Sequence, residues 1–89
     1  MGKGQGISRL RNGIERNITK SELERGYLFI SKDRQINSSC RFTLNWKLLG
    51  IRKIDSYGRI ALGRSCFEDL KEKKAKIRLS DGVIHVKLS

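Results

Sequence analysis

Arginine and lysine side chains flank a short polar segment near the middle of the chain. Arg52 and Lys53 precede the segment Asp55-Ser56-Tyr57-Gly58, and Arg59 follows it. A planar guanidinium can read a guanine edge or hold a phosphate with two hydrogen bonds, whereas a lysine ammonium binds phosphate as a point charge. These residue types in this order therefore predict contact with a polyanion.

The elements that would position these cations are predicted to be a strand, a tight turn and a second strand over residues 50–62. Glycine at position 58 permits the positive φ that a β-branched residue would resist. The stretch is therefore expected to form a stiff hairpin with Arg52, Lys53 and Arg59 on either side of its tip.

The residues Arg-Lys-Ile-Asp-Ser-Tyr-Gly-Arg-Ile-Ala-Leu at 52–62 resemble the looped-hinge hairpin of the AbrB/MazE/SpoVT-type, swapped-hairpin DNA-binding domains. The resemblance covers residues 50–88 and implies that Arg52 and Arg59 contact DNA. Gly63 stands where the family has proline, and Phe and Glu occupy the positions of its two helix arginines. The basic surface is therefore expected to draw on other residues, such as Arg64.

A weak internal repeat aligns the segment Gly-Tyr-Leu-Phe-Ile-Ser-Lys at 26–32 with Gly-Arg-Ile-Ala-Leu-Gly-Arg at 58–64, an offset of 32 residues. Each half would expose an apolar face that only the other half can cover. This predicts a mainly β fold, namely a small pseudo-symmetric barrel of two β-hairpin halves with one short helix, and Lys20 at the first hairpin tip.

The resemblance leaves two ways of closing such a barrel. In AbrB-like proteins two chains supply the halves, whereas a single chain supplies both in the related pseudobarrel DNA-binding domains of plant-type and EcoRII-type proteins. Residues 18–32 are similar to the opening hairpin of this second group. A monomer and a homodimer both remain open.

The order of polar and apolar residues also predicts the elements on either side of the hairpin. Cys40, Phe42, Leu44 and Trp46 alternate with polar residues and predict a strand with these four side chains in the core; an exposed Trp46 that stacks on a base is the alternative. A hydroxyl cap is expected to open a turn or one helical turn at 19–22. A capping box between Ser65 and residue 68 predicts a helix over 66–73.

The last hairpin is predicted from Asp81-Gly82, a type I′ turn signal between two alternating strands. A two-residue loop pairs Leu79 with Ile84, Ile77 with Val86 and Ala75 with Leu88 on an apolar face. The opposite face pairs Arg78 with His85 and Lys76 with Lys87. Like charges across a ladder cost stability, so this face is either a surface for an anion or simply solvated.

Composition and charge restrict the class of protein. The formal net charge of +11 favours a polyanionic partner. Residues 1–13 are Gly-rich and basic and are expected to form a flexible N-terminal arm, followed by a single domain over 14–89. No apolar run reaches the length of a membrane span, and Cys40 and Cys66 match neither a zinc motif nor a disulfide framework. An intracellular, cytoplasmic protein is expected, associated with the nucleoid if it binds DNA.

The patterns favour a DNA-binding protein over an enzyme, because the acidic residues are scattered and no nucleophile, phosphate-loop or metal-ligand motif is present. No cofactor is expected. The preferred function is binding of double-stranded DNA by a transcription regulator or a phage or plasmid factor. The alternatives are an RNA-binding or ribosome-associated β-barrel, or a basic protein that inhibits an acidic partner. The expected binding residues are Arg52, Lys53, Arg59, Lys20, Arg64, Lys76, Arg78 and Lys87.

Overall fold

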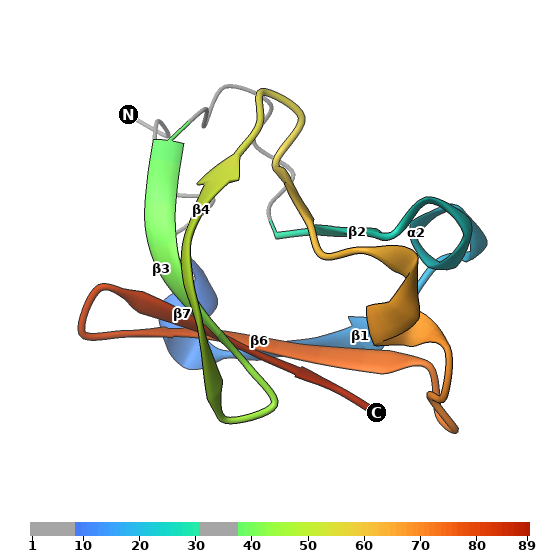
Figure 1. The fold of residues 1–89 in the computed structure, drawn as a ribbon. Coiled ribbons are helices and arrows are strands. Elements are labelled where there is room, and N and C mark those ends of the chain that lie inside the picture. The colour runs from blue at the N-terminus through green and yellow to red at the C-terminus, as the bar shows by residue number, and fades with distance from the viewer. Residues whose placement is uncertain (1–8, 31–37) are drawn as a thin grey trace.

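The computed structural model describes residues 9–30 and 38–89 and shows a mainly β fold, as predicted (Figure 1). A five-stranded sheet has the order β1-β6-β7-β3-β4, and β2 and β5 form a second sheet. The elements are η1 (Arg9–Asn12), β1 (Ile14–Asn17), α2 (Lys20–Arg25), β2 (Tyr27–Phe29), β3 (Ser38–Leu44), β4 (Lys47–Ile54), β5 (Arg59–Ala61), η2 (Arg64–Phe67), β6 (Lys74–Ser80) and β7 (Val83–Leu88).

The two sheets share one core. Leu28 and Ile60 from the small sheet lie in the same buried cluster as Phe42, Ile77 and Ile84 from the large sheet. All five side chains are almost fully removed from water. Burial of this apolar surface is the main force that holds the sheets together.

The β6–β7 hairpin has the predicted register. Leu79 pairs with Ile84 and Ile77 with Val86, so the apolar side chains share the inner face. Asp81 and Gly82 both have positive φ, 53° and 76°, as a type I′ turn requires.

A second hairpin, β3–β4, was not predicted. Its two-residue turn is formed by Asn45 and Trp46, whose φ values are 50° and 74°. The predicted alternation therefore stops at Leu44, and the assignment of Trp46 to the core is wrong: Trp46 is 81% exposed. β3 also lies parallel to β7 on its other side, which completes the large sheet.

The predicted hairpin over residues 50–62 is wrong in its pairing, although its strands and turn are present. The Gly58 N–H donates to the Asp55 carbonyl (2.9 Å), and the Asp55 N–H donates to the Arg59 carbonyl (3.0 Å). Beyond this turn the two strands separate, since β4 pairs with β3 and β5 pairs with β2. The turn connects the two sheets (Figure 1).

The internal repeat appears as a symmetric strand pair. β2 and β5 are antiparallel to each other, with Leu28 opposite Ile60. The Ile30 N–H donates to the Gly58 carbonyl (2.7 Å), and the Leu62 N–H donates to the Gly26 carbonyl (2.9 Å). The two hydrogen bonds are equivalent under the repeat, because Ile30 corresponds to Leu62 and Gly26 corresponds to Gly58 at the offset of 32 residues. The repeated segments are therefore related by a local pseudo-twofold axis.

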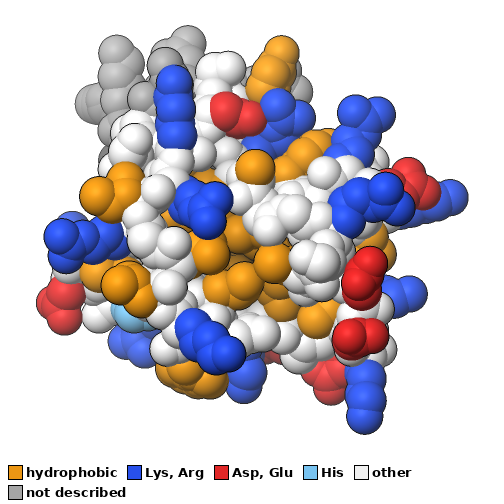
Figure 2. All heavy atoms as spheres, viewed as in Figure 1, with side chains coloured by type: hydrophobic (Ala, Val, Ile, Leu, Met, Phe, Trp, Pro, Cys, Tyr) orange, Lys and Arg blue, Asp and Glu red, His pale blue; other side chains and the backbone are white. Residues whose placement is uncertain are grey.

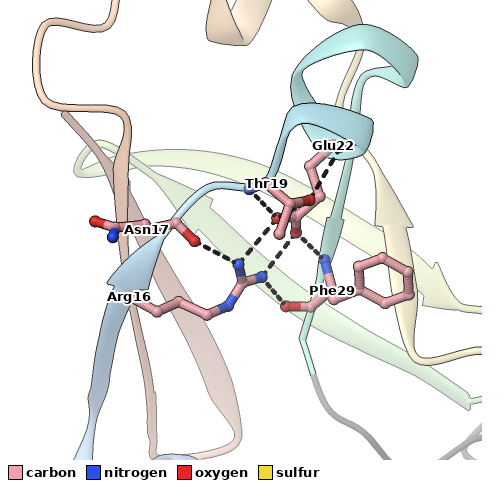
Figure 3. A network of polar contacts seen from close by, with 5 residues as sticks. All are labelled: Arg16, Asn17, Thr19, Glu22 and Phe29. Carbon is pink, nitrogen blue, oxygen red and sulfur yellow. Dashed lines mark hydrogen bonds and ion pairs between the residues drawn. The ribbon is translucent and has the colours of Figure 1, made fainter.

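A buried network around Glu22 ties β1, α2 and β2 together (Figure 3). Arg16 donates to both carboxylate oxygens of Glu22 (2.9 and 2.7 Å) and to the carbonyl of Phe29 (2.7 Å). The carboxylate also accepts the N–H of Thr19 (2.9 Å) and of Phe29 (2.8 Å). Burial raises the pKa of Glu22, but the hydrogen bonds from Arg16, Phe29 and Thr19 outweigh it and hold the pKa below its ordinary value.

The hydroxyl cap predicted at 19–22 is confirmed as a capping box between Thr19 and Glu22, which opens α2. The capping box predicted at Ser65 is wrong, and so is the helix over 66–73. Gly63 occupies the N-cap position without a side-chain bond, and the chain forms only the short 3-10 turn η2. Phe67 nevertheless packs in the core.

The folded part begins earlier than predicted. Arg9–Asn12 form η1, and Leu10 is buried in the core with 2% exposure. The predicted boundary at residue 13 is therefore too late, and the rest of the predicted arm lies outside the described residues. Over the described ranges, no helix is long and apolar enough to cross a membrane.

Candidate functional site

The basic residues predicted at the two hairpin tips belong to three different elements. Arg52 and Lys53 are neighbours on β4 and therefore point to opposite faces of the large sheet. Arg59 belongs to the small sheet, and Lys20 opens α2. The predicted single hairpin that would carry Arg52, Lys53 and Arg59 together is thus wrong, because the two strands that flank Asp55–Gly58 belong to different sheets.

Arg59 is engaged by its own turn. Its Nε donates to Asp55 Oδ2 (2.8 Å), and its guanidinium carbon lies 4.7 Å from the Tyr27 ring centroid and 4.8 Å from that of Tyr57. The hydrogen bond to Asp55 raises the pKa of Arg59. Burial raises the pKa of Asp55, but the Arg59 N–H and guanidinium outweigh this and lower it overall. Arg59 therefore stabilises the turn that joins the sheets.

The predicted cations of the last hairpin do lie together. Lys76 is directly opposite Lys87, and Arg78 is directly opposite His85. All three lysine and arginine side chains are exposed, because Ala75, Ile77 and Val86 take the inner positions of the same strands. These residues form the centre of what we call the basic face, the outward side of the five-stranded sheet.

The neighbouring strands extend the basic face. The Thr43 hydroxyl lies 2.8 Å from His85 Nδ1, which joins β3 to β7 on this side. Arg41 and Lys53 have the same orientation as Thr43 by strand alternation and register. Glu15 lies opposite Lys76. Among the paired positions of the described strands, it is the one acidic residue on this face. Lys74, two residues before Lys76 on β6, has the same orientation. Six Lys and Arg side chains therefore share the face with one carboxylate.

A groove of about 630 Å³ lies on the basic face. It crosses β6 and β7, with η1 and β1 on one side and the Trp46 turn on the other. The Lys87 ammonium lies 5.8 Å from the centroid of the Trp46 ring, within range of a cation–π interaction. The groove thus has an exposed aromatic wall next to a line of cations; it is lined by Asn12, Gly13, Ile14, Glu15, Thr43, Trp46, Lys76, Ile77, Arg78, Ser80, His85, Val86 and Lys87.

Arg64, Cys40 and Cys66 do not line this groove. Arg64, in η2, is exposed and sits beside Gly26. Figure 2 shows hydrophobic side chains in the middle of the viewed face, with Lys and Arg side chains around them. Cys40 and Cys66 are free thiols packed against the core. In residues 9–30 and 38–89, no group of three or more His, Cys, Asp or Glu side chains could hold a metal ion.

Sequence reasoning left Thr43 and Arg41 out of the predicted site and gave Trp46 only as an alternative stacking residue. Asn45 was the available signal, since asparagine tolerates the left-handed conformation and favours two-residue hairpin turns. A turn at Asn45-Trp46 would have exposed Trp46 and aligned Thr43 with Leu48 on the outer face.

Comparison with models of protein families, with curated proteins and with solved structures gave no match to this chain.

Proposed function

We propose that this chain is a nucleic-acid-binding protein and that its basic face is the contact surface. The observation that carries the proposal is the juxtaposition of Lys76, Arg78 and Lys87 along the groove. Among the paired positions of the described strands, Glu15 is the one acidic residue on this face. Cations arranged in this way bind successive phosphates and release condensed counterions. The net charge of +11 supports the same partner class.

The pairing of Lys76 with Lys87 adds a thermodynamic argument. Two like charges directly across a ladder destabilise a sheet by a few tenths of a kcal/mol or more. An anion between them would remove this repulsion and gain two charge-assisted contacts. Double-stranded DNA, which the AbrB-like motif predicts, and RNA both satisfy this chemistry.

The test compares two variants of equal charge. Lys76→Gln/Lys87→Gln removes two cations from the groove, whereas Lys20→Gln/Lys71→Gln removes two exposed cations outside it. Binding of labelled duplex DNA, single-stranded DNA and RNA is measured by fluorescence anisotropy over a series of salt concentrations. Log K, where K is the association constant, falls as log salt rises. The groove variant should make this negative slope shallower by about 1.4 to 1.8, and the control variant should change it far less.

Each outcome bears on the proposal. Equal losses in the two variants would contradict a localised binding surface. No binding to any of the three nucleic acids would reject the function and leave an acidic protein as the partner. Unfolding does not confuse the comparison, because removal of the Lys76–Lys87 repulsion should leave the free energy of unfolding unchanged or slightly higher.

A further inference from the structure

Trp46 is an exposed aromatic side chain on a fixed support. It lies in a two-residue turn in which both residues have positive φ, although neither is glycine. This conformation costs about 1–2 kcal/mol at Trp46, whereas asparagine tolerates it. Contacts with β7 hold it in place: the Asn45 N–H donates to the Val86 carbonyl (2.8 Å), and the Leu88 N–H donates to Asn45 Oδ1 (2.8 Å). The ring is therefore presented from a clamped turn and not from a loose loop.

The surroundings of the ring suit a nucleotide. Lys87 lies 5.8 Å from the ring centroid, and Lys76 faces Lys87 across the ladder. An indole face offers a stacking surface to any base, and the neighbouring ammonium groups offer charge to the phosphates on either side of it. An apolar peptide would use the ring but would leave these cations without partners.

We propose that the groove binds a single-stranded segment of nucleic acid, with one base stacked on Trp46 and the flanking phosphates held by Lys87 and Lys76. This inference rests on the proposed function and names its substrate class. A single strand is required because the faces of paired bases are covered by their neighbours in a duplex, whereas an unpaired base can be splayed onto an aromatic ring. The arrangement of Trp46 beside two lysines, with Arg59 held by Asp55, favours backbone and stacking contacts over reading of the major groove.

Trp46 is the single tryptophan of the chain, so its intrinsic fluorescence reports directly on stacking. Titration with a short oligothymidylate should quench this fluorescence. By anisotropy of a labelled oligonucleotide, Trp46→Ala should weaken binding roughly 5-fold to 150-fold, and Trp46→Phe should recover a large part of the loss. The salt slope should be unchanged in Trp46→Ala, because no phosphate contact is removed.

A blunt-ended duplex of two complementary strands, which has no unpaired bases, provides the contrast. Weaker binding of this duplex than of the single strand is expected. If the duplex binds more tightly and Trp46→Ala binds both as wild type does, the single-strand inference is wrong while the proposed function stands. If the wild type binds neither, the proposed function itself is wrong. Far-UV circular dichroism and thermal unfolding of Trp46→Ala test whether the fold is retained, and both should match the wild type.

Discussion

Replacement of Glu22 by glutamine tests how much of the stability depends on the buried network. The Glu22 side chain has no exposed area and accepts hydrogen bonds from Arg16, Thr19 and Phe29. Glutamine keeps one acceptor oxygen. Its NH₂ group replaces the other carboxylate oxygen and therefore faces the N–H donors that this oxygen accepts in the wild type. At least two hydrogen bonds are lost, and buried donors face each other. Each donor left without an acceptor lowers the free energy of unfolding by about 1–3 kcal/mol.

The expected cost of Glu22→Gln is therefore about 3 kcal/mol of unfolding free energy. This is the lower end of the range for breaking a buried ion pair, because the Arg16 side chain remains 28% exposed and water can partly solvate its charge. For a domain of this size, the loss corresponds to a fall in Tm of roughly 12–24 °C. Glu24→Gln is the control: Glu24 is exposed and lies 3.9 Å from Lys20, so its loss should cost less than about 0.5 kcal/mol.

The pH dependence provides a second measurement of the same network. The pKa of Glu22 in the folded protein lies below its ordinary value of 4.5, so the unfolded chain takes up the proton first as the pH falls. The stability contributed by the carboxylate is complete above about pH 5 and is lost as the pH falls through the folded pKa. The difference between wild type and Glu22→Gln should therefore narrow in acid.

Urea unfolding followed by far-UV circular dichroism measures both effects. A Glu22→Gln variant within about 0.5 kcal/mol of wild type at neutral pH would refute the reasoning. A difference that stays constant from neutral pH to about pH 3 would show that the carboxylate charge has no part in it.

Three further predictions follow from local geometry. Gly26→Ala should cost more than Gly13→Ala in urea unfolding: both glycines have positive φ, but only at Gly26 would a Cβ meet backbone atoms, 2.7 and 2.8 Å away. Asp55→Ala should cost about 1–2 kcal/mol in the same assay and Asp55→Asn less, because asparagine keeps the oxygen that accepts two backbone N–H groups. Trp46→Ala should change the Tm little, since the side chain is 81% exposed, whereas Phe42→Ala should cost about 3–5 kcal/mol.

Local signals were sufficient for one hairpin. In β6–β7 the Asp81-Gly82 turn and the strict alternation on both sides fix the register, and no distant segment can shift it without exposing a whole apolar face. The capping box at Thr19 was equally local, since Thr19 and Glu22 lie three residues apart. The same kind of pattern at Ser65 failed, because Gly63 took the N-cap position in its place.

The choice of strand partners could not be predicted from the hairpin motif. The turn at Asp55–Gly58 forms, but β4 pairs with β3, the strand directly before it, and β5 pairs with β2, which is distant in sequence. Asn45 is a local signal for a turn that exposes Trp46, but it is not sufficient by itself. Its turn conformation depends on hydrogen bonds between Asn45 and β7, a strand about 40 residues further along the chain.

The symmetric pair of strands also explains where free cations can lie. Ahead of each copy of the repeat, an acidic side chain binds an arginine and a backbone N–H: Glu22 binds Arg16 and the Phe29 N–H, and Asp55 binds the Nε and N–H of Arg59. Arg16 and Arg59 therefore stabilise the segments that lead into β2 and β5. β6 and β7 follow the second copy, and their outward positions are not needed for either turn. A ligand-binding surface can be built there without loss of the core, which is why we place it on these two strands.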